Sequence, residues 1–511
     1  MIRRPNIKLD RFQMFMLSIG CLISIYSFYF FMSNKVYLIG SDVYYYMSIA
    51  DSIIENGEMK DITTIPSRPV KTPQNGIAFV HVILSLLGIG AREKILTIVV
   101  ANYLLFLSGV YPLYRIARRS GLEKGLSLAA LLSVYLGAWH IYRINLLAIN
   151  DGIFNSMILW LIYLIVEFVQ YTSAPHNRLN FKRNDLKRIS VIFLFVIFLI
   201  HFRLLVILVI GSALISSLMV KNFRASAWFI VSCTLLVISF FSVYLFVEVA
   251  RLDNVTERYL YPMFTSINLY SLKLQLWKIL PRLVAGLSGL TNPLATLIFT
   301  IFPLSMMYCG FRGIIEKNFS KVFIASICLT GLWFTMSFQN PRTIWYIFPF
   351  IYLILLENKK SRIFGYIFVL LVFVQSLQQF YIGYWRGPES NLHLFIYNNE
   401  ILLEPNSILI TYRGRHGYIL LNTSSYRSKD FNRDGTVEIS DNLSWEKIKG
   451  RRKLFVLGDK KYIKSVFSQI NEVCLLKGYK LESNAITPDL DEFEGWALVE
   501  LKLKKINKTD S

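Results

Sequence analysis

The chain has 511 residues, of which 54% are hydrophobic and only 17% are charged. Because roughly a quarter of the residues in a soluble globular protein are charged, this composition excludes a soluble enzyme, and its hydrophobicity excludes a disordered chain or a coiled coil. The formal net charge of +22 would indicate nucleic acid on a soluble protein, but on a membrane protein it is first a signal of topology.

Long apolar runs dominate the chain before its polar tail. A membrane-spanning helix needs about 20 apolar residues. Eleven runs reach or approach this length, which predicts a polytopic α-helical membrane protein with about 11 spans. A shorter run at 76–91 is compatible with a re-entrant or interfacial helix that does not cross. The eleven runs begin at Phe12, Ile95, Leu126, Ile153, Ser190, Leu204, Ala227, Leu294, Val322, Trp345 and Ile363.

Basic residues indicate which ends of the spans face the cytoplasm. The positive-inside rule requires the large basic clusters to lie on one side of the membrane. All of them lie on the side of the N-terminus if 76–91 does not cross and if 190–219 is a hairpin of two short helices broken at 201–203. We therefore expect a multi-pass protein of the plasma or inner membrane with a cytoplasmic N-terminus. The clusters lie at 3–11, 115–124, 178–188, 221–224, 312–321 and 359–362.

Three predicted outer segments are long enough to carry chemistry: 34–94, 251–293 and everything after Gly387. The tail is polar and has no spanning run, so we predict two domains. These are a transmembrane catalytic domain over 1–385, with the long first outer loop 34–94, and an extracytoplasmic α/β domain over 386–511. Strands are expected in the tail at 407–412, 453–457 and 496–501, with a helix at 462–470.

Asp42 is the first candidate for a catalytic group. Ser41 is a possible N-cap, and Val43 and Met47 begin an apolar helical pattern that ends at Gly57, so Asp42 lies at the tip of an amphipathic helix near the membrane surface. The helix dipole stabilises its ionised form, which can still accept a proton from a substrate. The alternative is that Asp42 is only a favourable first-turn residue.

Asp151 is a second outer carboxylate. It lies at the start of the span that follows a short outer loop, and this loop also holds Arg143. An ionisable residue at such a boundary can simply be solvated. However, both aspartates are expected on the same side of the membrane, beside spans that ought to pack closely.

Taken in order, these elements resemble the GT-C class of membrane glycosyltransferases, which includes protein O-mannosyltransferases, the lipid A aminoarabinose transferase and oligosaccharyltransferase catalytic subunits. One span is followed by an outer loop that opens with Asp-x-Tyr-Tyr at 42–45, and then by a Pro-led apolar helix at 73–90. A span ending at 114–121, the carboxylate Asp151 and an Arg-Tyr element at 339–346 complete the likeness. The resemblance covers about residues 1 to 385 of this chain.

The resemblance implies that Asp42 is the base that activates the acceptor and that Asp151 supports the same cavity. The chain departs from the class in having no paired acidic residue beside Asp42, no Asp-x-Asp or Asp-x-Glu at 151, and no Trp-Trp-Asp in the tail. These absences argue against an oligosaccharyltransferase and leave a metal requirement open.

A lipid-phosphate donor needs cations for its departing phosphate more than it needs a general acid. Arg203 is favoured, because a basic residue among apolar helices is a functional candidate by default. For each candidate cation, the alternative is that its side chain reaches the lipid headgroups or is solvated. The candidate phosphate-binding residues are Arg203, Arg342, Arg143, Arg68 and Lys71.

Two further patterns lie in the outer segments. Aromatic residues in 251–293 are typical of a sugar-binding lid, although interfacial aromatics occur in any membrane protein. The segment 430–441 has the spacing of an EF-hand calcium loop of the dockerin-like kind, and the alternative is an Asp-Gly hairpin turn. The lid residues are Tyr259, Tyr261, Tyr270 and Trp277, and the calcium ligands would be Asp430, Asn432, Asp434, Glu438 and Asp441.

The sequence thus predicts an inverting glycosyltransferase that moves a sugar from a polyprenyl-phosphate donor to a glycan, lipid or protein acceptor on the extracytoplasmic face. Apart from the possible calcium no cofactor is expected, and the bilayer rather than nucleic acid is the partner. One rival is an O-antigen polymerase or ligase, in which the long outer loop typically comes late. The other is a flippase or transporter, which predicts inverted repeats and mid-membrane carboxylates that this sequence lacks.

Overall fold

The structure is a computed structural model, and the chain divides into two compact units. The first unit comprises 1–33, 71–76 and 97–382, and the second comprises 34–70, 77–96 and 383–511. The residues that the structure describes are 10–33, 41–61, 68–70, 75–123, 125–138, 149–173, 183–203, 205–247, 293–338, 347–359, 361–382, 408–410, 424–426, 430–431, 437–438, 454–486 and 496–506.

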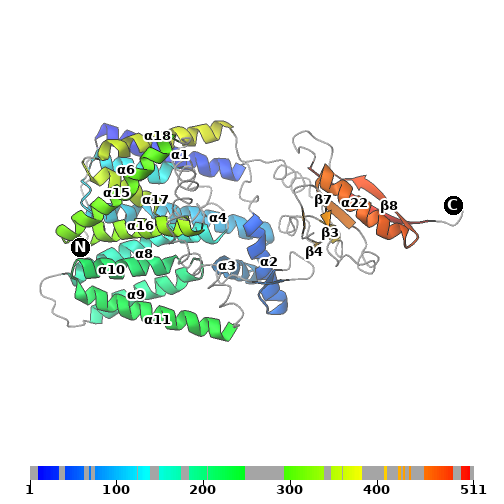
Figure 1. Cartoon of the computed structure of the whole chain (residues 1–511), viewed down its shortest axis with the longest axis horizontal. Coiled ribbons are helices and arrows are strands. Elements are labelled where there is room, and N and C mark those ends of the chain that lie inside the picture. Colours follow the sequence, from blue (N-terminus) through cyan, green and yellow to red (C-terminus); the bar gives the residue numbers. More distant parts are fainter. Residues whose placement is uncertain are drawn as a thin grey trace. The chain divides into compact units, whose positions relative to one another are not determined.

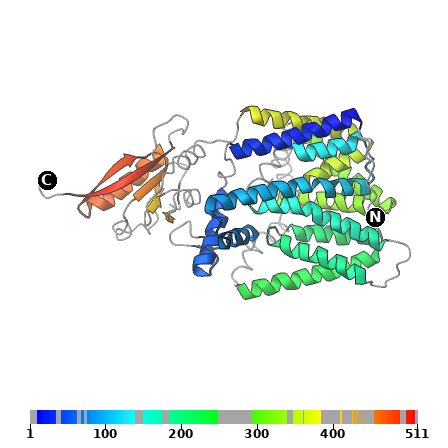
Figure 2. The ribbon, with the colours of Figure 1, turned by 180° about the vertical axis from the view of Figure 1, so that it is seen from behind.

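The first unit is a bundle of helices that lie side by side in both views (Figure 1, Figure 2). Large apolar side chains point outward from it, among them Leu22, Leu194 and Leu370, each more than 60% exposed, as expected of surfaces that face lipid. The helices are α1 (Arg11–Ser33), most of α4 (Ala91–Ser108), α5 (Val110–Arg119), α6 (Leu126–Gly137), α8 (Asn150–Thr172), α9 (Arg183–Ile200), α10 (Val206–Met219), α11 (Phe223–Val247), α15 (Pro293–Ile315), α16 (Phe319–Phe338), α17 (Phe348–Glu357) and α18 (Arg362–Ile382).

A helix lies at each of the eleven predicted apolar runs, which confirms the mostly helical membrane fold. Within the described ranges, three helical segments are long and apolar enough to cross a membrane, Arg11–Ser33, Glu93–Arg119 and Asn150–Thr172. The shorter helices leave the count of about 11 spans as a prediction.

The break predicted at 201–203 is present, because α9 ends at Ile200 and α10 begins at Val206. The apolar run at 76–91 forms α3 (Gly76–Leu86), which has 11 residues. A helix of this length rises about 16 Å, roughly half the thickness of the hydrocarbon core. This agrees with the prediction that the run does not cross.

The basic loops of the first unit gather at one end of its helices. Asn318 donates a hydrogen bond to the carbonyl of Arg119 (3.3 Å), which joins the α15–α16 turn to the end of α5. Glu167 near the end of α8 pairs with Arg119 at 3.3 Å, and Asn222 donates to Ser173, just after α8, at 2.8 Å. The first turn of α8 therefore lies at the opposite end, about 30 Å away. The clusters thus brought together are 115–124, 221–224 and 312–321.

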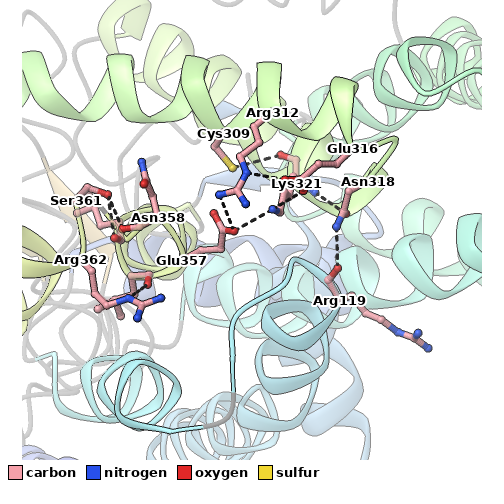
Figure 3. Close-up of polar contacts among 12 residues, drawn as sticks. Arg119, Cys309, Arg312, Glu316, Asn318, Lys321, Glu357, Asn358, Ser361 and Arg362 are labelled. Atoms are coloured by element: carbon pink, nitrogen blue, oxygen red, sulfur yellow. Dashed lines mark hydrogen bonds and ion pairs between the residues drawn. The ribbon is translucent and has the colours of Figure 1, made fainter.

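A buried charge network ties the α15–α16 turn to the end of α17 (Figure 3). Lys321, whose side chain is 4% exposed, lies 2.7 Å from Glu316 and 2.9 Å from Glu357. Arg312 lies 2.6 Å from Glu316 and 3.6 Å from Glu357. Since the side chain of Glu357 is only 8% exposed, Lys321 and Glu357 are both withdrawn from water, and each depends on the charge of the other.

The gathering of basic loops at one end leads to a topology prediction. In a chain whose five cysteines are replaced by alanine, Glu93→Cys and Lys461→Cys should react with an impermeant thiol reagent added outside intact cells. Glu123→Cys should react only after the cells are permeabilised. All three positions are exposed. Labelling at 123 from outside would mean that 76–91 crosses, and it would put Asp151 and the first loop on opposite sides.

The second unit begins with α2 (Ser41–Asn56), which buries Val43 and Met47 and ends before Gly57, where φ is +69°. Both the helix and its glycine end are as predicted. Ile49 packs with Ala78 of α3 in a small core. Two short strands follow α2 and pair antiparallel, β1 (Lys60–Asp61) and β2 (Arg68–Pro69).

The tail contains a five-stranded sheet with the order β4-β3-β7-β9-β8. Helix α22 (Lys460–Leu475) buries Tyr462, Val466, Ile470 and Cys474 at a spacing of four residues, and these pack on the sheet. The side chain of Asp459 caps it by accepting from the Tyr462 amide at 2.8 Å. The strands are β3 (Ile408–Ile410), β4 (Ser424–Tyr426), β7 (Leu454–Asp459), β8 (Tyr479–Ala485) and β9 (Trp496–Lys505).

Strand β4 and the longer strand β8 were missing from the sequence prediction, and β8 shows why. It is an edge strand, and within it only Leu481 is fully buried, so it lacks the apolar alternation by which strands are recognised. The predicted calcium segment begins with a hairpin ladder between β5 (Asp430–Phe431) and β6 (Val437–Glu438). This matches the hairpin alternative at its described ends, whereas Asn432, Asp434 and Asp441 lie outside the described residues, so the calcium site stays a prediction.

Candidate functional site

Asp151 is the predicted site residue that the structure describes most fully. It lies in the first turn of α8, after Ile149, whose extended backbone (φ −127°, ψ 166°) starts the helix without a side-chain cap. Asp151 is 4% exposed. The positive end of the helix dipole favours a carboxylate at this position, but its burial requires a partner as well.

The partner of Asp151 is Arg203, in the turn between α9 and α10. Nε of Arg203 donates to Oδ1 of Asp151 at 2.7 Å, and Nη2 donates to Oδ2 at 2.5 Å. This is a bidentate contact, which gives geometric specificity as well as energy. The Arg203 side chain is 22% exposed and that of Asp151 is 6% exposed. The structure thus joins two predicted site residues at the end of the bundle opposite the basic loops.

The turn that carries Arg203 is anchored by the start of α3. The Gly76 amide donates to the carbonyl of His201 at 2.9 Å. A helix leaves its first amides and last carbonyls without internal partners, so the start of α3 and the end of α9 satisfy each other here. Phe202 is 2% exposed, and a Cβ added to Gly76 would lie 3.0 Å from three atoms of its ring.

A separate polar cluster lies in the second unit. Lys94, with a side chain 7% exposed, donates to Ser85 at 2.7 Å and lies 3.8 Å from the carboxylate of Asp51. His81 is buried one turn before Ser85, and burial, helped by the charge of Lys94, lowers the pKa of His81 to about 3. His81 is therefore neutral at physiological pH and does not act as a cation for phosphate.

The other predicted site residues are not described at the level of their side chains. For Asp42 in α2 and Arg68 in β2 the structure describes the backbone alone. The remaining phosphate-binding and lid residues lie outside the described residues, namely Lys71, Arg143, Arg342, Tyr259, Tyr261, Tyr270 and Trp277. Their roles stay predictions.

Comparisons with known proteins find likeness in structure and not in sequence. No protein-family profile and no curated protein sequence matches the chain. A crystal structure of the oligosaccharyltransferase of Archaeoglobus fulgidus, tethered to an acceptor peptide containing the NVT sequon, matches 98% of this chain and 74% of that one, with a TM-score of 0.50 and 10% identity. The apo form of the same enzyme matches 91% and 71%, again with a TM-score of 0.50 and 10% identity.

The chain has the fold of that archaeal enzyme. The GT-C-like fold predicted from the sequence is thereby confirmed. Identity of 10% carries the fold alone, so the prediction that the chain is not an oligosaccharyltransferase stays a prediction.

The carboxylate of Asp151 is engaged by Arg203, which makes it a poor ligand for a metal ion. Both of its oxygens accept from Arg203, and the guanidinium beside them repels a cation. Among the described residues, no group of three or more His, Cys, Asp or Glu side chains is placed to hold a metal.

Asp151 and Arg203 were both predicted from the sequence, but in separate roles. Gly76 and Phe202 were not predicted as site residues. Asp151 and Arg203 are 52 positions apart in the sequence, and no pattern between them reveals their pairing. The sequence feature that pointed to both residues is that each is ionisable and lies beside an apolar run at the same predicted membrane face.

Proposed function

We propose that the chain is a membrane glycosyltransferase that transfers a sugar from a polyprenyl-phosphate donor to an acceptor on the extracytoplasmic face. The observation that carries the proposal is the Arg203 guanidinium, held by Asp151 in a helix-breaking turn at the end of the bundle opposite the basic loops. A lipid phosphate lies at the headgroup level of a membrane, where such a turn would meet it. The fold likeness to a membrane glycosyltransferase supports this assignment.

The proposed reaction is a single displacement. The Asp42 carboxylate takes the proton of the acceptor hydroxyl while its oxygen forms a bond to the anomeric carbon of the sugar. The bond from that carbon to the phosphate oxygen breaks on the opposite face, so the configuration inverts. Arg203 binds the phosphate as its negative charge increases, and a contact that strengthens in the transition state raises turnover.

The remaining assignments follow from the same proposal. Arg342, Arg143, Arg68 and Lys71 are additional candidates for the phosphate, and the aromatic residues of 251–293 are candidates for a lid. The tail is an extracytoplasmic domain, and the protein belongs to the plasma or inner membrane with its N-terminus in the cytoplasm.

A donor panel tests the proposed function. The purified full chain in nanodiscs is incubated with polyprenyl-phosphate hexoses and pentoses together with an envelope extract as the source of acceptor. We expect one donor to be consumed with release of polyprenyl phosphate, detected by mass spectrometry, and the Asp42→Asn variant to release none above background.

Two results would contradict the proposal. If no donor is cleaved but a fluorescent polyprenyl-phosphate sugar crosses proteoliposome membranes in the presence of the chain, the protein is a transporter. If polyprenyl-diphosphate oligosaccharides alone are joined or transferred whole, the protein is a polymerase or ligase of envelope polysaccharide.

A further inference from the structure

The geometry points to Gly76 as a positioning residue for Arg203, so that the first outer loop sets the phosphate-binding group of the donor site. This inference rests on the proposed function and deepens it. Asp151 is one support of Arg203. The second support is the turn itself, which the chain entering α3 holds in place.

The first step is the backbone contact. The Gly76 amide, at the start of α3, donates to His201 at 2.9 Å, two residues before Arg203. The His201 carbonyl follows directly after α9, so the positive end of one helix dipole meets the negative end of another. This contact holds the turn two residues before Arg203.

The second step is the close approach of Phe202. Its ring is buried at 2% exposure and packs 5.0 Å from the ring of Phe198, centroid to centroid. A Cβ on residue 76 would meet this ring at 3.0 Å, so the ring must give by a few tenths of an ångström to admit a side chain there. Phe202 directly precedes Arg203, and the displacement would reach the guanidinium.

The contact between Arg203 and Asp151 is bidentate, and this geometry makes it sensitive to the position of the turn. Both distances, 2.7 and 2.5 Å, require the guanidinium plane to face the carboxylate, and a point charge would not need this alignment. A site built in this way is sensitive to small shifts, and a misplacement of about 1 Å can cost up to a hundredfold in rate.

Gly76 would also couple the binding of the acceptor to the binding of the donor. Gly76 belongs to the helical bundle, and it lies in the same predicted outer loop as Asp42. Movement of this loop when the acceptor binds would therefore be transmitted through Gly76 and Phe202 to the group that holds the donor phosphate.

The test is a size-compensation experiment with full chain in nanodiscs and polyprenyl phosphate as the probe. We expect Gly76→Ala to weaken polyprenyl phosphate binding by roughly tenfold and to lower turnover with the donor. Phe202→Ala in the same chain should restore most of the binding, because it removes all three ring atoms that the new methyl group meets. In an Arg203→Ala background, Gly76→Ala should have no further effect.

Gly211→Ala is the matched control, since Gly211 lies in α10, five residues after its start, and an added Cβ there meets nothing within 4 Å. It should bind as the parent does. If Arg203→Ala loses binding but Gly76→Ala keeps it, or if the two losses add, the coupling through Gly76 is refuted and the proposed function stands. If Arg203→Ala binds polyprenyl phosphate as the parent does, the phosphate role of Arg203 fails, and the inference fails with it.

Discussion

Replacing Asp42 with asparagine should lower the transfer rate by a hundredfold or more while leaving expression and fold intact. The proposed task of this carboxylate is to remove the proton of the acceptor, and loss of a positioned base typically costs about a hundredfold or more. Asparagine is also a good residue at a helix start, so α2 keeps its beginning. The measurement is single-turnover transfer from the donor identified in the panel, together with the thermal unfolding midpoint.

Glu55→Gln is the matched control for Asp42→Asn. Glu55 is an exposed carboxylate near the other end of α2, and the change likewise replaces an acid by its amide. Its transfer rate should stay within a few-fold of the parent. A rate for Asp42→Asn that is also within a few-fold would show that Asp42 serves only the first turn of the helix.

Replacing Glu357 with alanine should lower the free energy of unfolding by about 3 kcal/mol or more. The reason is that Lys321, 4% exposed, would keep its charge in a buried position, where Glu316 is its remaining partner among the described residues. Removing one member of a buried ion pair costs more than the pair itself contributes, because the other charge remains without full compensation. The measurement is chemical unfolding of the purified chain in detergent micelles.

The neighbouring Glu316 offers a matched control, because it contacts the same lysine and arginine (Figure 3). Its side chain is 35% exposed against 8% for Glu357, and a solvated ion pair contributes about 0 to 1 kcal/mol. Glu316→Ala should therefore cost less than Glu357→Ala. Equal losses would show that burial does not determine the strength of this network.

Much of the helical architecture could be predicted from local sequence. The apolar runs coincide with helices, Gly57 ends α2, and α9 and α10 separate where His201, Phe202 and Arg203 interrupt the apolar pattern. Each of these depends on residues close together in the chain, where periodicity and turn chemistry are decisive. Strands β3, β7 and β9 and helix α22 of the tail were found in the same way.

Contacts between distant segments could not be predicted. Asp151 and Arg203 were each recognised as candidates, but their pairing depends on how α8 packs against the α9–α10 turn. Gly76 carried no special signal, since its importance comes from the ring of Phe202 and not from a positive φ. Strand β8 was missed because its neighbours in the sheet, and not its own alternation, determine that it is extended.

The order of strands in the tail has a consequence for how the protein is made. Strand β9 lies between β7 and β8 and pairs with both, although it follows both in the sequence. During synthesis β7 and β8 therefore emerge without the strand that lies between them, and the sheet stays incomplete until residues 496–505 arrive. The helices of the bundle, made earlier, can pack while this domain is still incomplete. Such late closure by a distant strand slows folding and exposes unpaired edges to aggregation meanwhile. The tail is thus the part of the chain whose yield should depend most on chaperones and growth temperature.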